Sequence, residues 1–224
     1  MLQNVQVICH SSVLIKKQKT IYIDPFKIKL NTNDADIIFI THNHYDHYSE
    51  EDIKKVKNRD TIIVVPTDLE ENAINIGFER ENIILVEPNK KYNIAQIKIK
   101  TIASYNIGKK FHPKENNWVG YVIEIDGISY YIPGDTDITP ENRKIKCDVA
   151  FVPVGGTYTM NSEEAAELVN EIKPKIAVPI HYGEVVGRKE DAIDFVKRVN
   201  KDIKCEILIK QIKTLHYLVL NSNC

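Results

Sequence analysis

Short apolar runs recur along the chain and are separated by polar or glycine-containing segments. Runs rich in Ile, Val and aromatic residues and bounded by turn residues are typical of buried β-strands. The alternation of Ile and Lys over 97–100 indicates instead a strand with one face in water. We predict a β-meander over 4–9 and 12–24, strands over 37–40, 61–65, 82–86, 92–95, 97–103, 119–125, 128–132, 148–154 and 176–180, and two final strands within 205–220.

Helices are predicted after several of these strands. Ser49 is a candidate N-cap for the first helix, with Asp52 as its capping partner, and Gly77 follows the second in the C′ position. Ser162 is the expected cap of a third helix, whose apolar residues form one stripe. The predicted helices span about 50–58, 68–76, 163–173 and 189–200. A chain that mixes strands and helices in this way belongs to the α/β (α+β) class.

Composition narrows the class of protein further. The chain has 224 residues, 43% hydrophobic and 27% charged, which suits one globular domain over 1–224. A net charge of −1 with mixed signs gives no reason to expect a nucleic-acid partner. No apolar run of membrane-spanning length is present, and four cysteines without a Cys-x-x-Cys favour a reducing cytoplasm. The sequence leaves open whether the chain forms a homo-oligomer.

A cluster of metal-ligand residues follows the apolar run at 37–40. His42, His44, Asp46 and His47 fall within six consecutive positions, and three of the seven histidines of the chain lie there. Residues two apart in an extended segment point to the same side, so His42 and His44 can converge on one ion. Asp46 and His47 then face a second ion beside it. Imidazole and carboxylate are ligands for zinc, manganese or iron, whereas the simpler alternative is a polar surface loop.

This His-x-His-x-Asp-His cluster after an apolar strand resembles the metallo-β-lactamase superfamily. Within it, the chain looks most like the compact metal-dependent hydrolases related to ascorbate-6-phosphate lactonase and N-acylphosphatidylethanolamine phospholipase D. The similarity runs from the strand before His10 to His181. It implies a four-layer αββα sandwich, which the residue pattern alone does not indicate because no residue-level repeat is evident.

Two further strands end in ligand-type residues. Gly134 allows a tight turn after the strand at 128–132 and directs Asp135 toward the site, although Asp135 could also be a plain turn residue. The resemblance makes Asp135 the carboxylate shared by two ions. It assigns His181, after the strand at 176–180, to the second ion. The implied ligand sets are His42 and His44 for the first ion and Asp46, His47 and His181 for the second.

The segment 101–118 departs from the family pattern. The superfamily has a metal-binding histidine near this strand end, but Tyr105 and Asn106 stand there and His112 comes several residues later. His112 could reach back to the first ion, bind substrate or stack on Trp118. Tyr105, Asn106 and Thr157 are expected to contact substrate. The Gly155-Gly156 turn could offer backbone N–H groups to an anionic substrate or could be a simple turn.

Two residues near the N-terminus have supporting roles in this reading. Asp24 follows an apolar strand, where an unpaired charge would be costly. We interpret Asp24 as a carboxylate that accepts a hydrogen bond from the N–H of a histidine and fixes its orientation, with a turn aspartate before Pro25 as the alternative. His10 is interpreted as a structural histidine with satisfied hydrogen bonds and not as a ligand.

The resemblance implies two divalent metal ions, with zinc as the first candidate and manganese or iron as alternatives. A metal-bound hydroxide would attack a phosphodiester, lactone or related ester, with Asp46 and Asp135 as catalytic carboxylates. Lys109, Lys110 and Lys114 are consistent with a small anionic or ester substrate, or simply with a solvated face. The alternative function is a non-catalytic metal-binding or ligand-binding protein with a degenerate first metal site.

Overall fold

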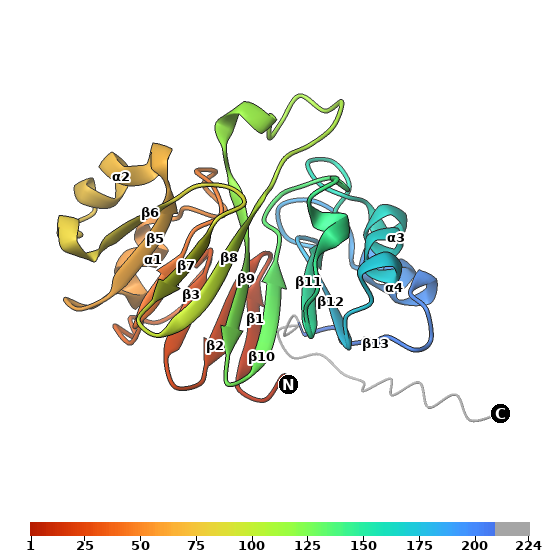
Figure 1. The fold of residues 1–224 in the computed structure, drawn as a ribbon, viewed down its shortest axis with the longest axis horizontal. Coiled ribbons are helices and arrows are strands. Elements are labelled where there is room, and N and C mark those ends of the chain that lie inside the picture. Colours follow the sequence, from red (N-terminus) through yellow and green to blue (C-terminus); the bar gives the residue numbers. More distant parts are fainter. Residues whose placement is uncertain (209–224) are drawn as a thin grey trace.

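The computed structural model describes residues 1–208, which form two packed β-sheets flanked by helices (Figure 1). Within these residues, one sheet has six strands in the order β1-β2-β3-β4-β5-β6 and the other has seven in the order β13-β12-β11-β10-β9-β8-β7. The strands of the first sheet are β1 (Val5–Cys9), β2 (Ser12–Lys16), β3 (Thr20–Ile23), β4 (Ile37–Phe39), β5 (Ile62–Pro66) and β6 (Ile83–Val86). Those of the second are β7 (Lys91–Ile94), β8 (Ile97–Ala103), β9 (Val119–Ile125), β10 (Ile128–Ile132), β11 (Val149–Pro153), β12 (Ile176–Ile180) and β13 (Lys204–Cys205).

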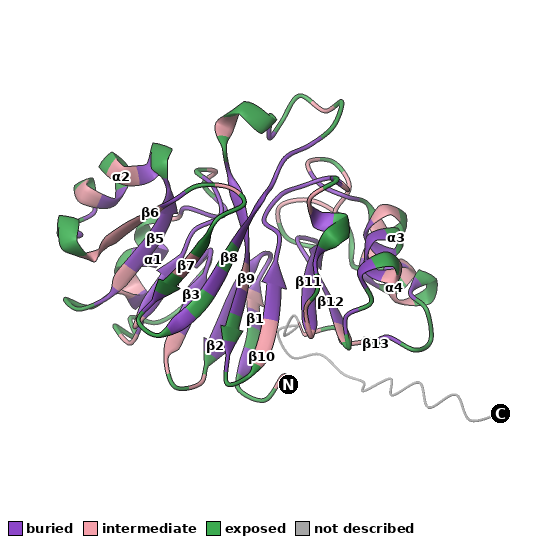
Figure 2. Ribbon diagram, viewed as in Figure 1, coloured by how far each residue is buried: buried purple, intermediate pink, exposed green. Residues whose placement is uncertain are grey.

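Three apolar clusters define the layers. The largest lies between the sheets and takes residues from both, such as Ile15 and Phe39 from the first and Ile123 and Phe151 from the second. Separate clusters lie under the helices on the two outer faces (Figure 2). The helices are α1 (Glu50–Val56) and α2 (Glu70–Asn75) on one side, and α3 (Ser162–Ile172) and α4 (Lys189–Arg198) on the other. This is the αββα order that the resemblance implied.

Each sheet has an antiparallel half and a parallel half. Strands β1 to β3 and β7 to β10 pair antiparallel, whereas β3 to β6 and β10 to β13 pair parallel. The parallel strands β4 and β11 are buried throughout, because helices cover their outer face. The antiparallel strand β8 alternates between buried and exposed residues over 97–100, as its sequence predicted.

Most element boundaries match the expectations to within two or three residues, with some differences. The first helix ends at Val56, the last ends at Arg198, and a 3₁₀ turn over Thr67–Leu69 replaces the start of the second. The cap of α3 is Asn161 and not Ser162, because the Asn161 side chain accepts hydrogen bonds from the N–H groups of Glu163 and Glu164. Of the strands predicted within 205–220, residues 206–208 form none, and 209–220 lie outside the described residues.

The cap of α1 is Ser49, as predicted, and its Oγ accepts a hydrogen bond from the N–H of Asp52. The Asp52 carboxylate also accepts hydrogen bonds from the N–H groups of Lys27 and Ile28, which fastens the segment after β3 to the helix. Among residues 1–208, none of the helices has both the length and the apolar character needed to cross a bilayer.

Candidate metal centre

The site lies at one edge of the two sheets, where several strands end. His42, His44, Asp46 and His47 follow β4 in the first sheet, and Asp135 and His181 follow β10 and β12 in the second. Carboxyl ends of parallel strands meet at the same edge, so residues far apart in the chain come together there. The turn after β1 adds His10, and the long connection between β8 and β9 adds His112.

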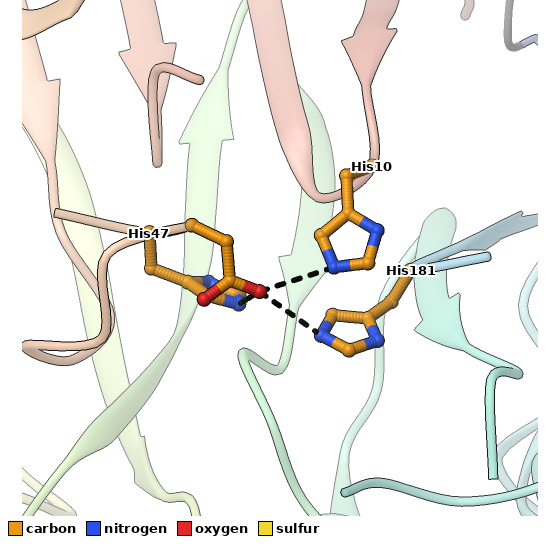
Figure 3. A group of neighbouring side chains, drawn as sticks. His10, His47 and His181 are labelled. Carbon is orange, nitrogen blue, oxygen red and sulfur yellow. Dashed lines mark ion pairs between the residues drawn. The ribbon is translucent and has the colours of Figure 1, made fainter. Parts of the chain in front are cut away.

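Two groups of potential ligand atoms that share no residue result, and a third group, made of His42, His47 and Asp135, bridges them. His42, His44 and His112 form one group, and His10, Asp46, His47 and His181 form the other, with the ligand atoms of each group within 4.8 Å of one another. In the first group, Nε2 of His112 lies 3.4 Å from Nε2 of His42. In the second, His10, His47 and His181 surround the carboxylate of Asp46 (Figure 3).

Asp135 lies between the two groups. Its Oδ1 is 3.2 Å from Nε2 of His47, and its Oδ2 is 3.1 Å from Nε2 of His181. The same Oδ2 is 3.3 Å from Nε2 of His112, which belongs to the other group. Ser104 fixes the backbone here, since its Oγ donates to the carbonyl of Asp135. One buried carboxylate therefore contacts both groups.

The residues present fit a pair of divalent metal ions. Among residues 1–208, Nε2 of His47, Nε2 of His181 and Oδ1 of Asp135 are buried without a hydrogen-bond partner. Such atoms are costly to bury in a folded protein unless something else satisfies them. The short contacts that these three atoms make lack hydrogen-bond geometry. This is expected when the lone pairs of ligand atoms are directed at a metal position. Nitrogen and carboxylate oxygen donors are the set that zinc and similar ions accept.

The electrostatics of the site keep most of these groups in the form that binds a metal. Burial lowers the pKa of His42 well below its usual value and that of His112 to about 4, so both imidazoles are neutral at neutral pH. Burial tends to raise the pKa of Asp135, but His181 and His47 outweigh it and hold the pKa well below the usual range. Burial also tends to raise the pKa of Asp46, but His10, His47 and His181 together outweigh it and lower the pKa to about 2.

His47 differs from its neighbours. Burial tends to lower its pKa, but the carboxylates of Asp135 and Asp24 outweigh burial and raise the pKa well above the usual value. In the metal-free protein His47 therefore carries a proton at neutral pH. A metal that binds Nε2 of His47 must displace that proton.

Asp24 makes the contact expected of it. Its fully buried carboxylate accepts a hydrogen bond from Nδ1 of His47 at 2.7 Å and two more from the N–H and Oγ1 of Thr41. A partner on Nδ1 fixes the ring and directs Nε2 toward Asp135. Gly134 makes room for this arrangement, because a Cβ there would lie 2.9 Å from Cβ of Thr41.

The connection between β8 and β9 doubles back and brings His112 to His42 and His44. Asn106 holds the loop closed: its N–H donates to the carbonyl of His112, and its Nδ2 donates to the carbonyls of Phe111 and Tyr158. Trp118 packs its ring 5.0 Å from His42 and 5.1 Å from His44, and also contacts His112 edge-on at 5.5 Å. This placement agrees with the first of the three options for His112, in which it reaches back toward His42 and His44. The contact with Trp118 is present as well.

The other residues expected to contact substrate lie in different surroundings. The hydroxyl of Tyr105 donates to Glu141, and Tyr105 and Trp118 both line a cavity of about 350 Å³. Thr157 is exposed in its turn. The N–H groups of Gly156 and Thr157 donate to the carbonyls of Met160 and Gly155, which favours the simple turn over an anion-binding turn.

Gly155 is instead needed for close packing. A Cβ on Gly155 would lie 2.4 Å from the carbonyl oxygen of His181, so only glycine lets this turn pack against the ligand-bearing loop. Two of the three lysines of the long connection are paired with acidic residues. Lys109 contacts Asp137 and donates to the carbonyl of Thr159, and Lys114 pairs with Glu141 at 3.0 Å.

His10 was expected to be a structural histidine with satisfied hydrogen bonds, and the satisfied hydrogen bonds are not found within the described part of the chain. It is fully buried beside Asp46, and among residues 1–208 neither of its ring nitrogens has a hydrogen-bond partner. A satisfied structural histidine would have such partners. The clue in the sequence was its place directly after an apolar strand, which it shares with the other candidate ligands.

Comparison with known proteins identifies the family of this chain. The family model for the beta-lactamase superfamily domain matches residues 4–181, and the chain belongs to this family. A metal-dependent hydrolase of Lysinibacillus sphaericus is 31% identical over 189 residues, which cover 77% of this chain and 82% of that protein. At this level the predicted class, a metal-dependent hydrolase of the metallo-β-lactamase superfamily, is confirmed.

Solved structures share the fold. A Parabacteroides distasonis protein provisionally named a metal-dependent hydrolase is 29% identical, with a TM-score of 0.79 and coverage of 92% of this chain and 93% of that one. Igni18, a metallo hydrolase from Ignicoccus hospitalis, superposes with a TM-score of 0.73 over 92% of this chain and 94% of its own. At 23% identity the second similarity shows the fold alone. The predicted four-layer architecture is confirmed.

Proposed function

We propose that the protein is a dinuclear metal-dependent hydrolase that acts on a phosphodiester, lactone or related ester. The observation that carries the proposal is that Asp135 contacts both ligand groups, whose buried nitrogens at His47 and His181 have no hydrogen-bond partner within residues 1–208. His42, His44 and His112 would hold one ion, and Asp46, His47 and His181 the other, with zinc as the first candidate. Bound ions of this kind supply a Lewis acid and lower the pKa of a water molecule.

The residues of the chain have distinct tasks in this proposal. Asp46 and Asp135 provide the negative charge that balances the cations, and their low pKa values keep them ionised at neutral pH. Asp24 orients His47 through Nδ1. His42 and His47 are buried, whereas His44 is half-buried, so substrate would reach the centre from the side of His44.

The rim of the site favours an ester with an apolar group over a highly charged substrate. Tyr45, between His44 and Asp46, is 67% exposed, and Phe111, beside His112, is 43% exposed. By contrast, Lys109 is neutralised by an acidic partner. Exposed aromatic side chains beside a reaction centre are suited to apolar parts of a small molecule.

The alternative function, a binding protein with a degenerate first site, rested on the missing histidine at the end of β8. His112 lies near His42 and His44 from a later position, and this proximity supports the hydrolase over that alternative. The fold does not identify the reaction by itself, so the choice depends on the site residues.

The test measures bound metal and turnover together. Protein stripped with a chelator is reloaded with zinc, manganese or iron and assayed on a phosphodiester, a lactone and a carboxylic ester. We expect turnover only after reloading, and we expect Asp46→Ala and His181→Ala to lose both turnover and one metal equivalent. Asp148→Asn is the matched control, because Asp148 accepts hydrogen bonds from Ser129 away from the site. Metal binding without turnover on any substrate would favour the binding protein.

A further inference from the structure

His10 stands at a position where its backbone conformation is unfavourable. Cys9 pairs with Ser12, so His10 and Ser11 form the two-residue turn between β1 and β2. The φ angle of His10 is 54°, in the left-handed region. Two-residue hairpin turns that require a positive φ favour Gly, Asn or Asp, and another residue there costs on the order of 1 kcal/mol. This turn places His10 in one group with Asp46, His47 and His181.

The imidazole of His10 lies inside the second ligand group. Its Nε2 is 3.2 Å from Oδ2 of Asp46, and its ring centroid is 3.9 Å from that of His181 (Figure 3). The residue is fully buried. Within residues 1–208, neither ring nitrogen has a hydrogen-bond partner. Burial of an imidazole without partners would be costly unless another group satisfies it.

His10 also shares the geometry of the proposed ligands. Nε2 of His47 and Nε2 of His181 approach Asp135 at 3.2 and 3.1 Å without forming hydrogen bonds within the described residues. Nε2 of His10 approaches Asp46 at 3.2 Å in the same way. Donor atoms that lie close together without forming hydrogen bonds to one another have the arrangement expected of ligands around a single metal ion.

The backbone links His10 to His181 as well. The N–H of His181 donates to the carbonyl of His10 at 3.1 Å, and His181 has a φ of 59°. Two histidines in left-handed conformations, one from each sheet, are thus joined across the edge where the sheets meet. Backbone strain of this kind persists where the surrounding structure enforces it, and it concentrates at functional sites.

We propose that His10 is an additional ligand of the second metal ion and binds it through Nε2, beside Asp46, His47 and His181. This inference rests on the proposed function in one respect, namely that a second ion is bound. It adds a ligand from β1, so the N-terminal hairpin becomes part of the metal centre.

The test compares zinc binding to the wild-type protein with zinc binding to His10→Gly. Glycine suits the turn, so we expect this variant to fold, and circular dichroism checks that it does. Calorimetric titration of the metal-free wild type should show two zinc sites. In His10→Gly the affinity of one of the two sites should fall at least on the order of 100-fold, which is the upper end of the loss for an outer partner, while the other site keeps its affinity. Cobalt absorption should change in the variant, because the ion loses a nitrogen ligand.

Lys173→Gly is the matched control. Lys173 also has a left-handed φ, of 52°, but it caps the C-terminus of α3 and is not among the ligand groups. It should leave both zinc affinities unchanged. If the wild type has two zinc sites and His10→Gly keeps both affinities and the same cobalt spectrum, this inference alone is overturned. A wild-type protein that binds no zinc would overturn the proposed function with it.

If His10→Gly does not fold, the wild-type protein crystallised with zinc decides the question. The inference predicts a distance of about 2.0–2.1 Å between the ion and Nε2 of His10, the usual zinc–nitrogen distance. An ion bound by Asp46 and His181, with Nε2 of His10 more than about 3 Å away, would contradict it.

Discussion

Asp24→Asn should weaken the second metal site without removing a ligand. In the wild type, Oδ1 of Asp24 accepts from the N–H of Thr41, and Oδ2 accepts from Oγ1 of Thr41 and Nδ1 of His47. Asparagine can keep the first contact but places an NH₂ group against the other two. The Thr41 hydroxyl can rotate and accept, whereas Nδ1–H of His47 cannot.

The expected loss follows from that one contact. A hydrogen bond to a charged group contributes about 1.5–3 kcal/mol, and about 1.4 kcal/mol corresponds to a tenfold change in affinity. We therefore expect zinc to bind the second site roughly 10–100-fold more weakly, which is also the usual effect of losing a ligand's supporting partner. The first site, with His42, His44 and His112, should keep its affinity.

Competition with a chelator of known zinc affinity measures this effect, and Asp148→Asn is the control. Asp148 also accepts several hydrogen bonds, from the N–H and Oγ of Ser129, and pairs with Lys175 at 2.8 Å. Both variants should lower the free energy of unfolding, but only Asp24→Asn should lower zinc affinity. If Asp24→Asn lost stability and retained wild-type affinity for two zinc ions, Asp24 would have no role in orienting His47.

Three other changes probe separate parts of the centre. His112→Asn should weaken zinc binding at one site and leave the other unchanged, as measured by calorimetry. If both zinc affinities stayed unchanged, the loop would not contribute to the first site. Gly155→Ala should weaken zinc binding at the second site, because its Cβ would lie 2.4 Å from the carbonyl of His181, and unchanged affinity would mean that the turn can move aside. Zinc binding should release a proton at neutral pH, because Asp135 and Asp24 raise the pKa of His47, so that affinity increases as the pH rises. Titrations in buffers of different ionisation enthalpy count that proton, and a count of zero would contradict the protonated state of His47.

Local patterns predicted the elements of the fold well, because burial leaves a direct mark on the sequence. Continuous apolar runs became the buried strands β4 and β11, and the alternation over 97–100 became the half-exposed strand β8. The α3 cap was misplaced by one residue, since Asn161 and Ser162 are both good caps and only the backbone angle distinguishes them. The order of the layers came from the family resemblance, because pairing between distant strands leaves no periodicity to read.

The candidate site was predictable where ligands are adjacent in the chain or follow a strand. The segment 42–47, Asp135 and His181 all have that pattern, and the structure brings them together. His112 was left open, because its position depends on a loop closed by Asn106 through backbone contacts that no motif encodes. The proximity of His10 to Asp46 was not predicted for a similar reason, since the left-handed turn that contains His10 depends on the pairing of β1 with β2.

Native mass spectrometry of the wild type and of Asp135→Asn after zinc loading tests the central claim most directly. Asp135 contacts both ligand groups through its two carboxylate oxygens. We predict a wild-type mass with two zinc ions and a variant that retains at most one. A wild type without bound zinc, or an Asp135→Asn variant that still holds two ions as tightly, would contradict the dinuclear centre.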